Sequence, residues 1–295
     1  MGVPITSRSN PAFQHLRRLA TDARERAQAG RTLIEGDHLI GAWVGHGLPV
    51  VSCAVDAAAL ELPAIAATIA RLRLAGIEPL VLAGALMHQV SALDSAAKLI
   101  AEIEPRAGDL GRARGEDSVV LDAVQDPGNV GAILRTCAAA GIRHVIAGPG
   151  NAALWSPKVI RAAMGAHAVL NLISIDAGSG GGVGGLPAVI AALGVPALGT
   201  SPHASASVYD TALAQSCAWV FGHEGRGLSA PVESALTRRL AIPQAPGVES
   251  LNVAAAVAVC LFEQRRQRRA AAAPPDAATL TGAGTGSRGR ASRTG

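Results

Sequence analysis

Three short polar segments, far apart in the chain, carry residue types that could bind a ligand and support a reaction. They are residues 129–135, 222–227 and 250–252. Each follows an apolar, strand-like run that ends in a turn rich in glycine or proline, and its polar side chains lie where a helix is expected to begin. Ligands of open α/β sheets bind at the edge where strands end and loops start. The three segments together therefore predict one functional site at such an edge.

The first segment offers an amide and a guanidinium at the start of a predicted helix. Pro127 and Gly128 form the turn, and Asn129 is a candidate helix N-cap whose amide could instead face a ligand. Arg135 follows six residues later in an apolar stretch, so its side chain extends either to solvent or into a polar cleft. Taken alone, this segment is better explained by an ordinary helix start with a surface arginine than by a functional site.

The second segment, GHEGRG, has three glycines in six residues. Glycine lets the backbone approach a ligand closely and adopt positive φ. Glu224 stands between glycines, which is unusual for a mere turn, although a loop with a solvated glutamate remains the alternative.

The third segment precedes a strongly apolar helix predicted over 253–262. Ser250 or Asn252 could simply cap that helix. Ile242 and Leu251 could form an apolar wall beside a flat ligand ring.

The elements that must hold these segments fall into two groups. An amphipathic helix is predicted over 10–29. Strands are also predicted at 31–35, 49–53 and 79–82. Further helices are predicted at 37–45, 60–75 and 91–98. This alternation predicts a small α/β domain over residues 1–105, followed by a polar linker over 106–117.

The second group alternates strand and helix throughout. The predicted segments are 118–122, 128–140, 144–147, 156–163, 169–175, 186–193, 195–199, 211–215, 217–221, 230–236, 238–242 and 252–267. Strands separated by helices imply a parallel sheet covered on both faces, which we place in a domain over 118–268. Residues 269–295 contain almost no large apolar side chain, so we expect a disordered tail.

Composition narrows the class of protein. The formal net charge is +4, and the residues from 263 onward supply seven arginines against two acidic side chains. The four cysteines are isolated, so we expect reduced core thiols and no metal site. The N-terminus lacks an apolar signal core, and glycines and prolines interrupt the uncharged stretch 177–209. We therefore expect a soluble, cytoplasmic protein without a membrane partner.

Read together, the three segments resemble a known family. DPGNVGAILRTCAAAG, VFGHEGRGLS and IPQAPGVESLNVAAAVAVCLFE are similar, in order and spacing, to the three motifs of the SpoU (TrmH-type) RNA 2′-O-ribose methyltransferases of the SPOUT superfamily. The resemblance covers about 118–268. The stretch ITSRSNPAFQHLRRLATDARERAQAGRTLIEGDHLI also resembles the N-terminal RNA-binding domain fused to many of these enzymes.

The resemblance implies an α/β fold whose C-terminal parallel sheet contains a deep trefoil knot, and a homodimer that binds S-adenosylmethionine. It implies a structured RNA substrate, ribosomal RNA more than tRNA. The implied cofactor contacts are Gly222, Ile242 and Leu251, with Thr200, Gly225 and Val253 nearby. The implied catalytic and RNA-facing residues are Asn129, Arg135, Glu224, Ser250 and Asn252.

The resemblance also implies individual roles. The family's proposed base corresponds to Arg135, but a guanidinium is hardly ever deprotonated in proteins. We therefore expect Arg135 to hold the adjacent phosphate and the 2′ oxygen electrostatically. RNA contacts of the first domain are expected on one helix, at Arg17, Arg18, Arg24 and Arg26, unless these form an ordinary solvated face.

One position departs from the family pattern. His223 stands where the family most often has Asn, and an imidazole is bulkier and can titrate near neutral pH.

Two other functions are kept as alternatives: a methyltransferase of the same superfamily that acts on tRNA, and a non-catalytic RNA-binding protein that retains the fold. A nicotinamide site at the glycine run 178–185 is disfavoured, because no acidic residue follows until Asp210.

Overall fold

The computed structural model describes residues 3–91, 96–175, 185–248 and 250–272. Residues 178–184 of the glycine run and residues 273–295 of the predicted tail lie outside this description. Residues 269–272 were expected to belong to the tail but form the last turn of a helix instead.

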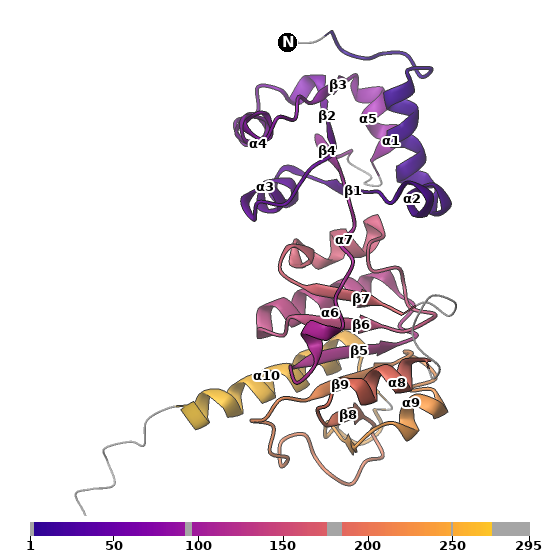
Figure 1. The fold of residues 1–295 in the computed structure, drawn as a ribbon, viewed down its shortest axis with the longest axis vertical. Coiled ribbons are helices and arrows are strands. Elements are labelled where there is room, and N and C mark those ends of the chain that lie inside the picture. The colour runs from indigo at the N-terminus through magenta and orange to yellow at the C-terminus, as the bar shows by residue number, and fades with distance from the viewer. Residues whose placement is uncertain (1–2, 92–95, 176–184, 249, 273–295) are drawn as a thin grey trace, which may run out of the picture.

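The first part of the chain builds a four-stranded sheet in the order β1-β4-β2-β3 (Figure 1). β4 is antiparallel to β1 and β2, whereas β2 and β3 are parallel. Its strands are β1 (Thr32–Glu35), β2 (Ser52–Asp56), β3 (Leu80–Leu82) and β4 (Leu99–Ile103). Its helices are α1 (Pro11–Thr21), α2 (Ala23–Ala29), α3 (Asp37–Gly45), α4 (Pro63–Leu74) and α5 (Gly84–Val90).

Two predictions for this part were wrong. The helix expected over 91–98 is not formed by the described residues of that range, and α5 ends at Val90. The strand β4 was not predicted, because the charged Glu102, which is buried, interrupts its apolar run without producing an alternating pattern. The helix expected over 10–29 is divided at Asp22, whose side chain accepts the N–H groups of Arg24 and Glu25 and so starts α2.

The second part is a six-stranded parallel sheet in the order β10-β8-β9-β5-β6-β7, which confirms the predicted α/β class. Its strands are β5 (Ser118–Asp122), β6 (His144–Ala147), β7 (Asn171–Ser174), β8 (Ala197–Thr200), β9 (Ala218–Gly222) and β10 (Arg238–Leu240). Its helices are α6 (Pro127–Ala140), α7 (Pro157–Ala163), α8 (Gly185–Ala192), α9 (Ala230–Ser234) and α10 (Val253–Ala272). The helix expected over 211–215 does not form.

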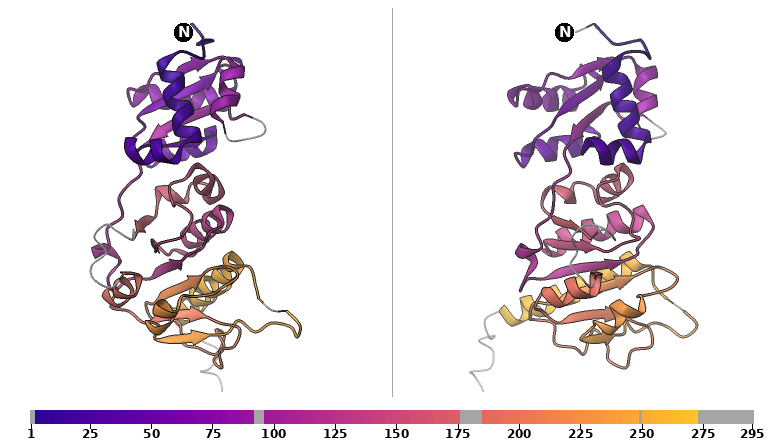
Figure 2. Two further views of the ribbon diagram at one scale, coloured as in Figure 1. Left: turned by 90° about the vertical axis from the view of Figure 1, so that its right-hand side faces the viewer. Right: turned by 45° about the vertical axis from the view of Figure 1, so that its right-hand side comes forward.

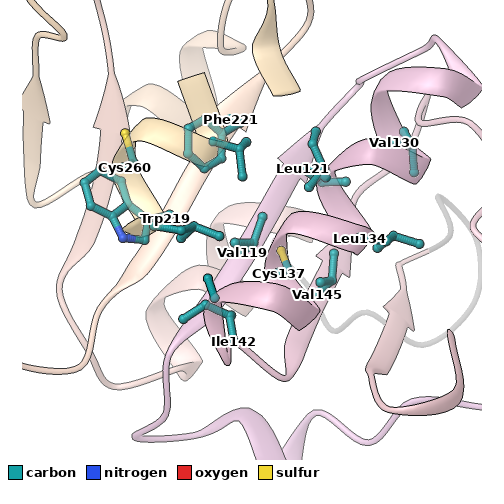
Figure 3. Close-up of a cluster of buried hydrophobic side chains, with 14 of the residues drawn as sticks. Val119, Leu121, Val130, Leu134, Cys137, Ile142, Val145, Trp219, Phe221 and Cys260 are labelled. Carbon is teal, nitrogen blue, oxygen red and sulfur yellow. The ribbon is translucent and has the colours of Figure 1, made fainter. Parts of the chain in front are cut away.

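Helices cover both faces of this sheet. Val119 and Leu121 of β5 point to α6, α7 and α10, whereas Val120 points to α8 and α9. Trp219 and Phe221 of β9 lie in the first of these layers, beside Cys260 of α10 (Figure 3). Both ring systems are almost fully buried.

The two parts lie one above the other (Figure 2), and both polar and apolar contacts join them. The Thr32 hydroxyl donates to the Trp155 carbonyl at 2.9 Å, and Trp43 packs edge-on against the Trp155 ring. Ile160 of α7 is buried in the core cluster of the first sheet. Gly108 of the linker touches β7 so closely that a Cβ would lie 2.2 Å from the Leu172 carbonyl oxygen.

The C-terminal helix is held by buried polar contacts at the amino ends of the strands. Asp117 accepts hydrogen bonds from Arg268 and from the Gln264 amide, and Gln264 also accepts from the Trp219 indole. Arg265 caps α6 through the Ala140 carbonyl. The basic stretch 265–269 is therefore largely engaged within the fold. Within the described ranges, no helix combines the length and apolar character that crossing a bilayer requires.

The segment after β10 runs beside the loop that follows β8. Ala241 accepts a backbone hydrogen bond from Val208 and donates one to Ala206, and Ser201 donates to Leu240. These contacts involve the C-terminal part of the sheet, where the resemblance implies a knot, and the knot itself stays a prediction.

Candidate active site

The carboxyl ends of three neighbouring parallel strands converge at one edge of the larger sheet. β8 ends at Thr200, β9 at Gly222 and β5 at Asp122. The Asp122 carboxylate, buried at 8% exposure, accepts the N–H of Ser229 at 2.7 Å and ties the end of β5 to the chain beyond the GHEGRG turn. Sequence reasoning missed this positioning role.

Asn129 is not the helix cap that the sequence suggested. α6 begins two residues earlier, at Pro127, and Asp126 is its N-cap. The Asp126 carboxylate accepts the backbone N–H of Asn129 at 2.7 Å. Because Asp126 takes the capping role, the amide of Asn129 is available for contacts outside its own helix.

That amide joins the other two segments. Its Nδ2 donates to Glu224 Oε1 at 3.0 Å, and its Oδ1 accepts from Asn252 Nδ2 at 2.9 Å. The Asn252 Oδ1 accepts the N–H groups of Ala254 and Ala255 and thereby caps α10. Residues separated by 95 and 123 positions along the chain thus form one hydrogen-bonded row.

Glu224 is held as a carboxylate. Burial acts to raise its pKa, but hydrogen bonds from the Asn129 amide and from the backbone N–H groups of Asp126 and Gln125 outweigh that effect. The pKa of Glu224 therefore lies below its ordinary value, and the group serves as an acceptor that orients Asn129.

His223 finds a structural role in the turn. Its Nδ1 accepts the backbone N–H groups of Gly225 at 2.9 Å and Arg226 at 3.3 Å, so the ring proton belongs on Nε2. The backbones of His223 and Gly227 exchange two hydrogen bonds of 2.9 Å. An Asn side-chain oxygen can accept in the same way, so the imidazole can fill the role of the Asn that the resemblance implies here.

Gly222 is required by the same turn. A Cβ on Gly222 would lie 2.4 Å from the backbone of Gly227, which itself has a φ of 69°. The two glycines let β9 and the returning chain touch backbone to backbone.

A pocket of about 260 Å³ lies where these segments meet. Five of the six predicted cofactor residues line it, namely Thr200, Gly222, Ile242, Leu251 and Val253. Gly225 does not line it and belongs to the turn held by His223. Of the predicted catalytic residues, Glu224, Ser250 and Asn252 line the pocket, and Asn129 is bonded to two of these three.

Gln244 is a pocket residue that the sequence reasoning overlooked. Its Oε1 is buried and has no hydrogen-bond partner among the residues that the structure describes. A buried, unpaired carbonyl oxygen is costly, so it indicates a missing donor. Gln244 lies two residues after Ile242, which also lines the pocket, and in an extended segment this spacing places both side chains on one side.

Arg135 lies apart from this pocket. It is exposed on α6 and makes no ion pair or side-chain hydrogen bond to the described residues. Six residues along a helix place it about 9 Å from Asn129 in axial rise and about 120° around the axis. The structure thus brings together four of the five predicted catalytic residues and leaves Arg135 at the surface.

The four arginines predicted to contact RNA differ in their surroundings. Arg26 donates to the Leu19 carbonyl at the end of α1, and Arg18 lies 3.5 Å from Glu25. The Arg17 and Arg24 side chains are exposed and make no ion pair with the described residues.

Comparisons with known proteins agree with this geometry. Residues 117–262 match the model of the SpoU rRNA Methylase family. An uncharacterized tRNA/rRNA methyltransferase of Synechocystis is 32% identical over 88% of this chain and 93% of its own length. A 23S rRNA (uridine(2479)-2′-O)-methyltransferase of Streptomyces viridochromogenes is 30% identical over 88% of this chain and 90% of its own length.

A solved structure has the same architecture. The SpoU methyltransferase AviRb from Streptomyces viridochromogenes, in complex with the cofactor AdoMet, superposes with a TM-score of 0.76 at 29% identity, covering 88% of this chain and 100% of that one.

Proposed function

Because the chain belongs to the SpoU rRNA methylase family, we propose that it transfers the methyl group of S-adenosylmethionine to the 2′-hydroxyl of a ribose in 23S ribosomal RNA. The observation that carries this proposal is the hydrogen-bonded row Glu224–Asn129–Asn252, whose two end members line the pocket. It unites all three polar segments at the carboxyl edge of the sheet, where such folds bind ligands.

The pocket suits S-adenosylmethionine. Ile242 and Leu251 give it apolar walls, and the unpaired Oε1 of Gln244 can accept a hydrogen bond from an amino or hydroxyl group. The absence of side chains at Gly222 and Gly227 leaves backbone groups exposed to the pocket. When bound, the cofactor supplies a methyl group on a positively charged sulfur, which is already activated for transfer.

The remaining task of the protein is to position the ribose and to stabilise charge on its oxygen. Asn129 is held rigidly by Glu224 on one side and Asn252 on the other, so it can present a fixed polar surface to the ribose. Ser250 lies at the same pocket with its hydroxyl unengaged by the described residues. We assign these residues to orientation of the substrate.

Arg135 is assigned to the RNA phosphate rather than to the cofactor. Its exposed guanidinium is free to make a bidentate contact with a phosphate group. A phosphate held there would place the neighbouring ribose at the start of α6, where Asn129 lies. Arg17 and Arg24, which carry no ion pair, are assigned to additional RNA contacts from the first domain, over residues 1–105.

We propose that the enzyme acts as a homodimer. Phe262 of α10 is 47% exposed, and Val248 and Leu251 beside the pocket are 52% and 39% exposed. A homodimer, which the resemblance implies, would remove these side chains from water if they lie at its interface. Analytical ultracentrifugation tests this, and a monomer at micromolar concentration would contradict it.

Four free, buried cysteines fit the reducing cytoplasm, where ribosomal RNA is found.

Methyl transfer to purified RNA tests the proposed function. The full-length protein is incubated with radiolabelled S-adenosylmethionine and, separately, with protein-free 23S rRNA and bulk tRNA. We expect label in 23S rRNA, at one nucleotide whose 3′ phosphodiester becomes resistant to alkali. Label only in tRNA would support the tRNA alternative. Tight RNA binding without cofactor binding, measured by calorimetry, would support a non-catalytic protein.

A further inference from the structure

A second polar cavity lies at the opposite edge of the larger sheet. It measures about 570 Å³ and is enclosed by the linker and the amino ends of β6 and β7. Its polar lining residues are Arg106, Arg112, Glu116, Arg143, His144 and Asn171. We call it the linker cavity, and it has no part in the pocket described above.

The linker cavity has a surplus of positive charge. Three guanidiniums line it, against the single carboxylate of Glu116. None of the three arginines forms an ion pair with the described residues. The neighbouring Asp117 carboxylate is occupied by Arg268, and Asp109 accepts the backbone N–H of Gly111. The carboxylates of Glu116 and Asp109 offset part of the charge of the three guanidiniums, and a positive surplus remains.

Arg106 is held in a fixed position within this charge. Its Nη2 donates to the carbonyl oxygens of His167 at 2.6 Å and Ala168 at 3.1 Å, and its guanidinium lies 5.8 Å from the centre of the Trp43 ring. Burial and the nearby positive charge of Arg112 lower the pKa of Arg106. Its Nε and Nη1 make no hydrogen bond to the described residues, so they remain available to a ligand.

Asn171 fixes the other side of the cavity. Its side chain accepts the Asp109 N–H at 2.9 Å and donates to the Asp109 carbonyl at 2.8 Å, which attaches the linker to β7. It also donates to His144 Nδ1 at 2.9 Å, so His144 carries its proton on Nε2 and is a donor as well. The cavity thus presents hydrogen-bond donors on a rigid frame.

We propose that the linker cavity binds phosphate groups of the RNA backbone. Three guanidiniums line one cavity, and that of Arg106 is held by hydrogen bonds, an arrangement suited to bidentate phosphate contacts. β5 to β9 have four or five residues, so the two edges lie about 13–17 Å apart along the strands, a separation that a folded RNA bridges readily. This inference rests on the proposed function, since it assigns the cavity to the same RNA substrate.

The test compares two double variants of the full chain. R112A/R143A removes two cavity charges and leaves the structural contacts of Arg106 intact. R71A/R238A is the matched control, because both arginines are exposed and make no ion pair with the described residues. Binding to protein-free 23S rRNA is measured at several salt concentrations, and S-adenosylmethionine affinity is measured by calorimetry to verify the fold.

For R112A/R143A we expect RNA affinity to fall about 10- to 100-fold and the salt slope to decrease by about two, one for each lost contact, with cofactor affinity unchanged. RNA affinity and salt slope equal to those of the control would overturn the inference. A second result would also overturn it. If inorganic pyrophosphate stabilises wild type but not R112A/R143A, while both proteins bind RNA equally well, the cavity binds a small free anion instead of RNA.

Methyl transfer by the wild type separates this result from the proposed function. If wild type methylates 23S rRNA and R112A/R143A binds it normally, the cavity assignment alone fails. If wild type methylates no RNA but R112A/R143A loses RNA affinity, the proposed function fails and the cavity assignment stands.

Discussion

Asn252 donates its side-chain N–H to Asn129 across 2.9 Å, and this contact fixes the orientation of both amides. The Asn252 oxygen must face the N–H groups that begin α10, so its nitrogen faces Asn129. Asn129 then presents its oxygen to Asn252 and its nitrogen to Glu224, which only accepts when ionised. The capping of α10 by Asn252 thereby determines which side-chain atoms donate and which accept along the row Glu224–Asn129–Asn252.

Asn252→Asp separates capping from orientation. Aspartate still caps α10 but has no N–H to donate, so we expect methyl transfer to fall about 10- to 100-fold while the unfolding midpoint stays near that of wild type. Asn252→Ala should lose the cap as well, at a cost of about 1 kcal/mol. Equal activity of Asn252→Asp and wild type would show that the row is irrelevant to transfer.

The lowered pKa of Glu224 predicts how the stability of the protein depends on pH. Because the folded state lowers its pKa, its stabilising contribution is complete above its unfolded-state pKa, about 4.5, and is lost as pH falls through the folded value. The difference in unfolding midpoint between wild type and Glu224→Gln should therefore be constant above about pH 4.5 and shrink below it. A difference that grows on acidification would contradict the assignment.

Substitution of His223 tests its role as a backbone acceptor. His223→Asn retains an acceptor for the N–H groups of Gly225 and Arg226, so cofactor affinity should stay within about threefold of wild type. His223→Ala leaves both without a side-chain partner and should weaken cofactor binding about tenfold. Calorimetry with S-adenosylmethionine measures both, and equal affinities in the two variants would disprove the role.

Arg135 should affect RNA and turnover but not the cofactor. We expect Arg135→Ala to reduce kcat/KM for RNA by at least about 100-fold with unchanged S-adenosylmethionine affinity, because the side chain lies outside the pocket. Arg135→Lys keeps the charge and loses the planar fork, so an intermediate rate is expected. Full activity of Arg135→Ala would remove Arg135 from the mechanism.

Gly222→Ala should disrupt the cofactor turn. The added Cβ meets the Gly227 backbone at 2.4 Å, so the turn must move, at a cost of about 1–3 kcal/mol. The unfolding midpoint and cofactor affinity should both fall. Gly41→Ala is a control elsewhere, since Gly41 has no positive φ and its Cβ would make only ordinary contacts, at 3.7 Å to Thr68 and 3.8 Å to Arg71. An unaltered cofactor affinity in Gly222→Ala would refute the close approach.

The sequence by itself determined much of the larger sheet. β5 and β6 were predicted with their observed bounds, since buried parallel strands bounded by turns leave a strong local signal. It also determined the family, because the order and spacing of three motifs are linear properties of the chain. The pocket followed from these motifs, with Ile242 and Leu251 on its walls as expected.

The tertiary structure decided which polar groups meet. Local reasoning made Asn129 a helix cap, whereas Asp126 caps and Asn129 bonds to Glu224 and Asn252, 95 and 123 residues away. The tertiary structure likewise placed Arg135 outside the pocket and gave His223 its acceptor role. Hydrogen bonds depend on distances of about 3 Å between atoms, and only the packing of strands and helices sets such distances between remote segments.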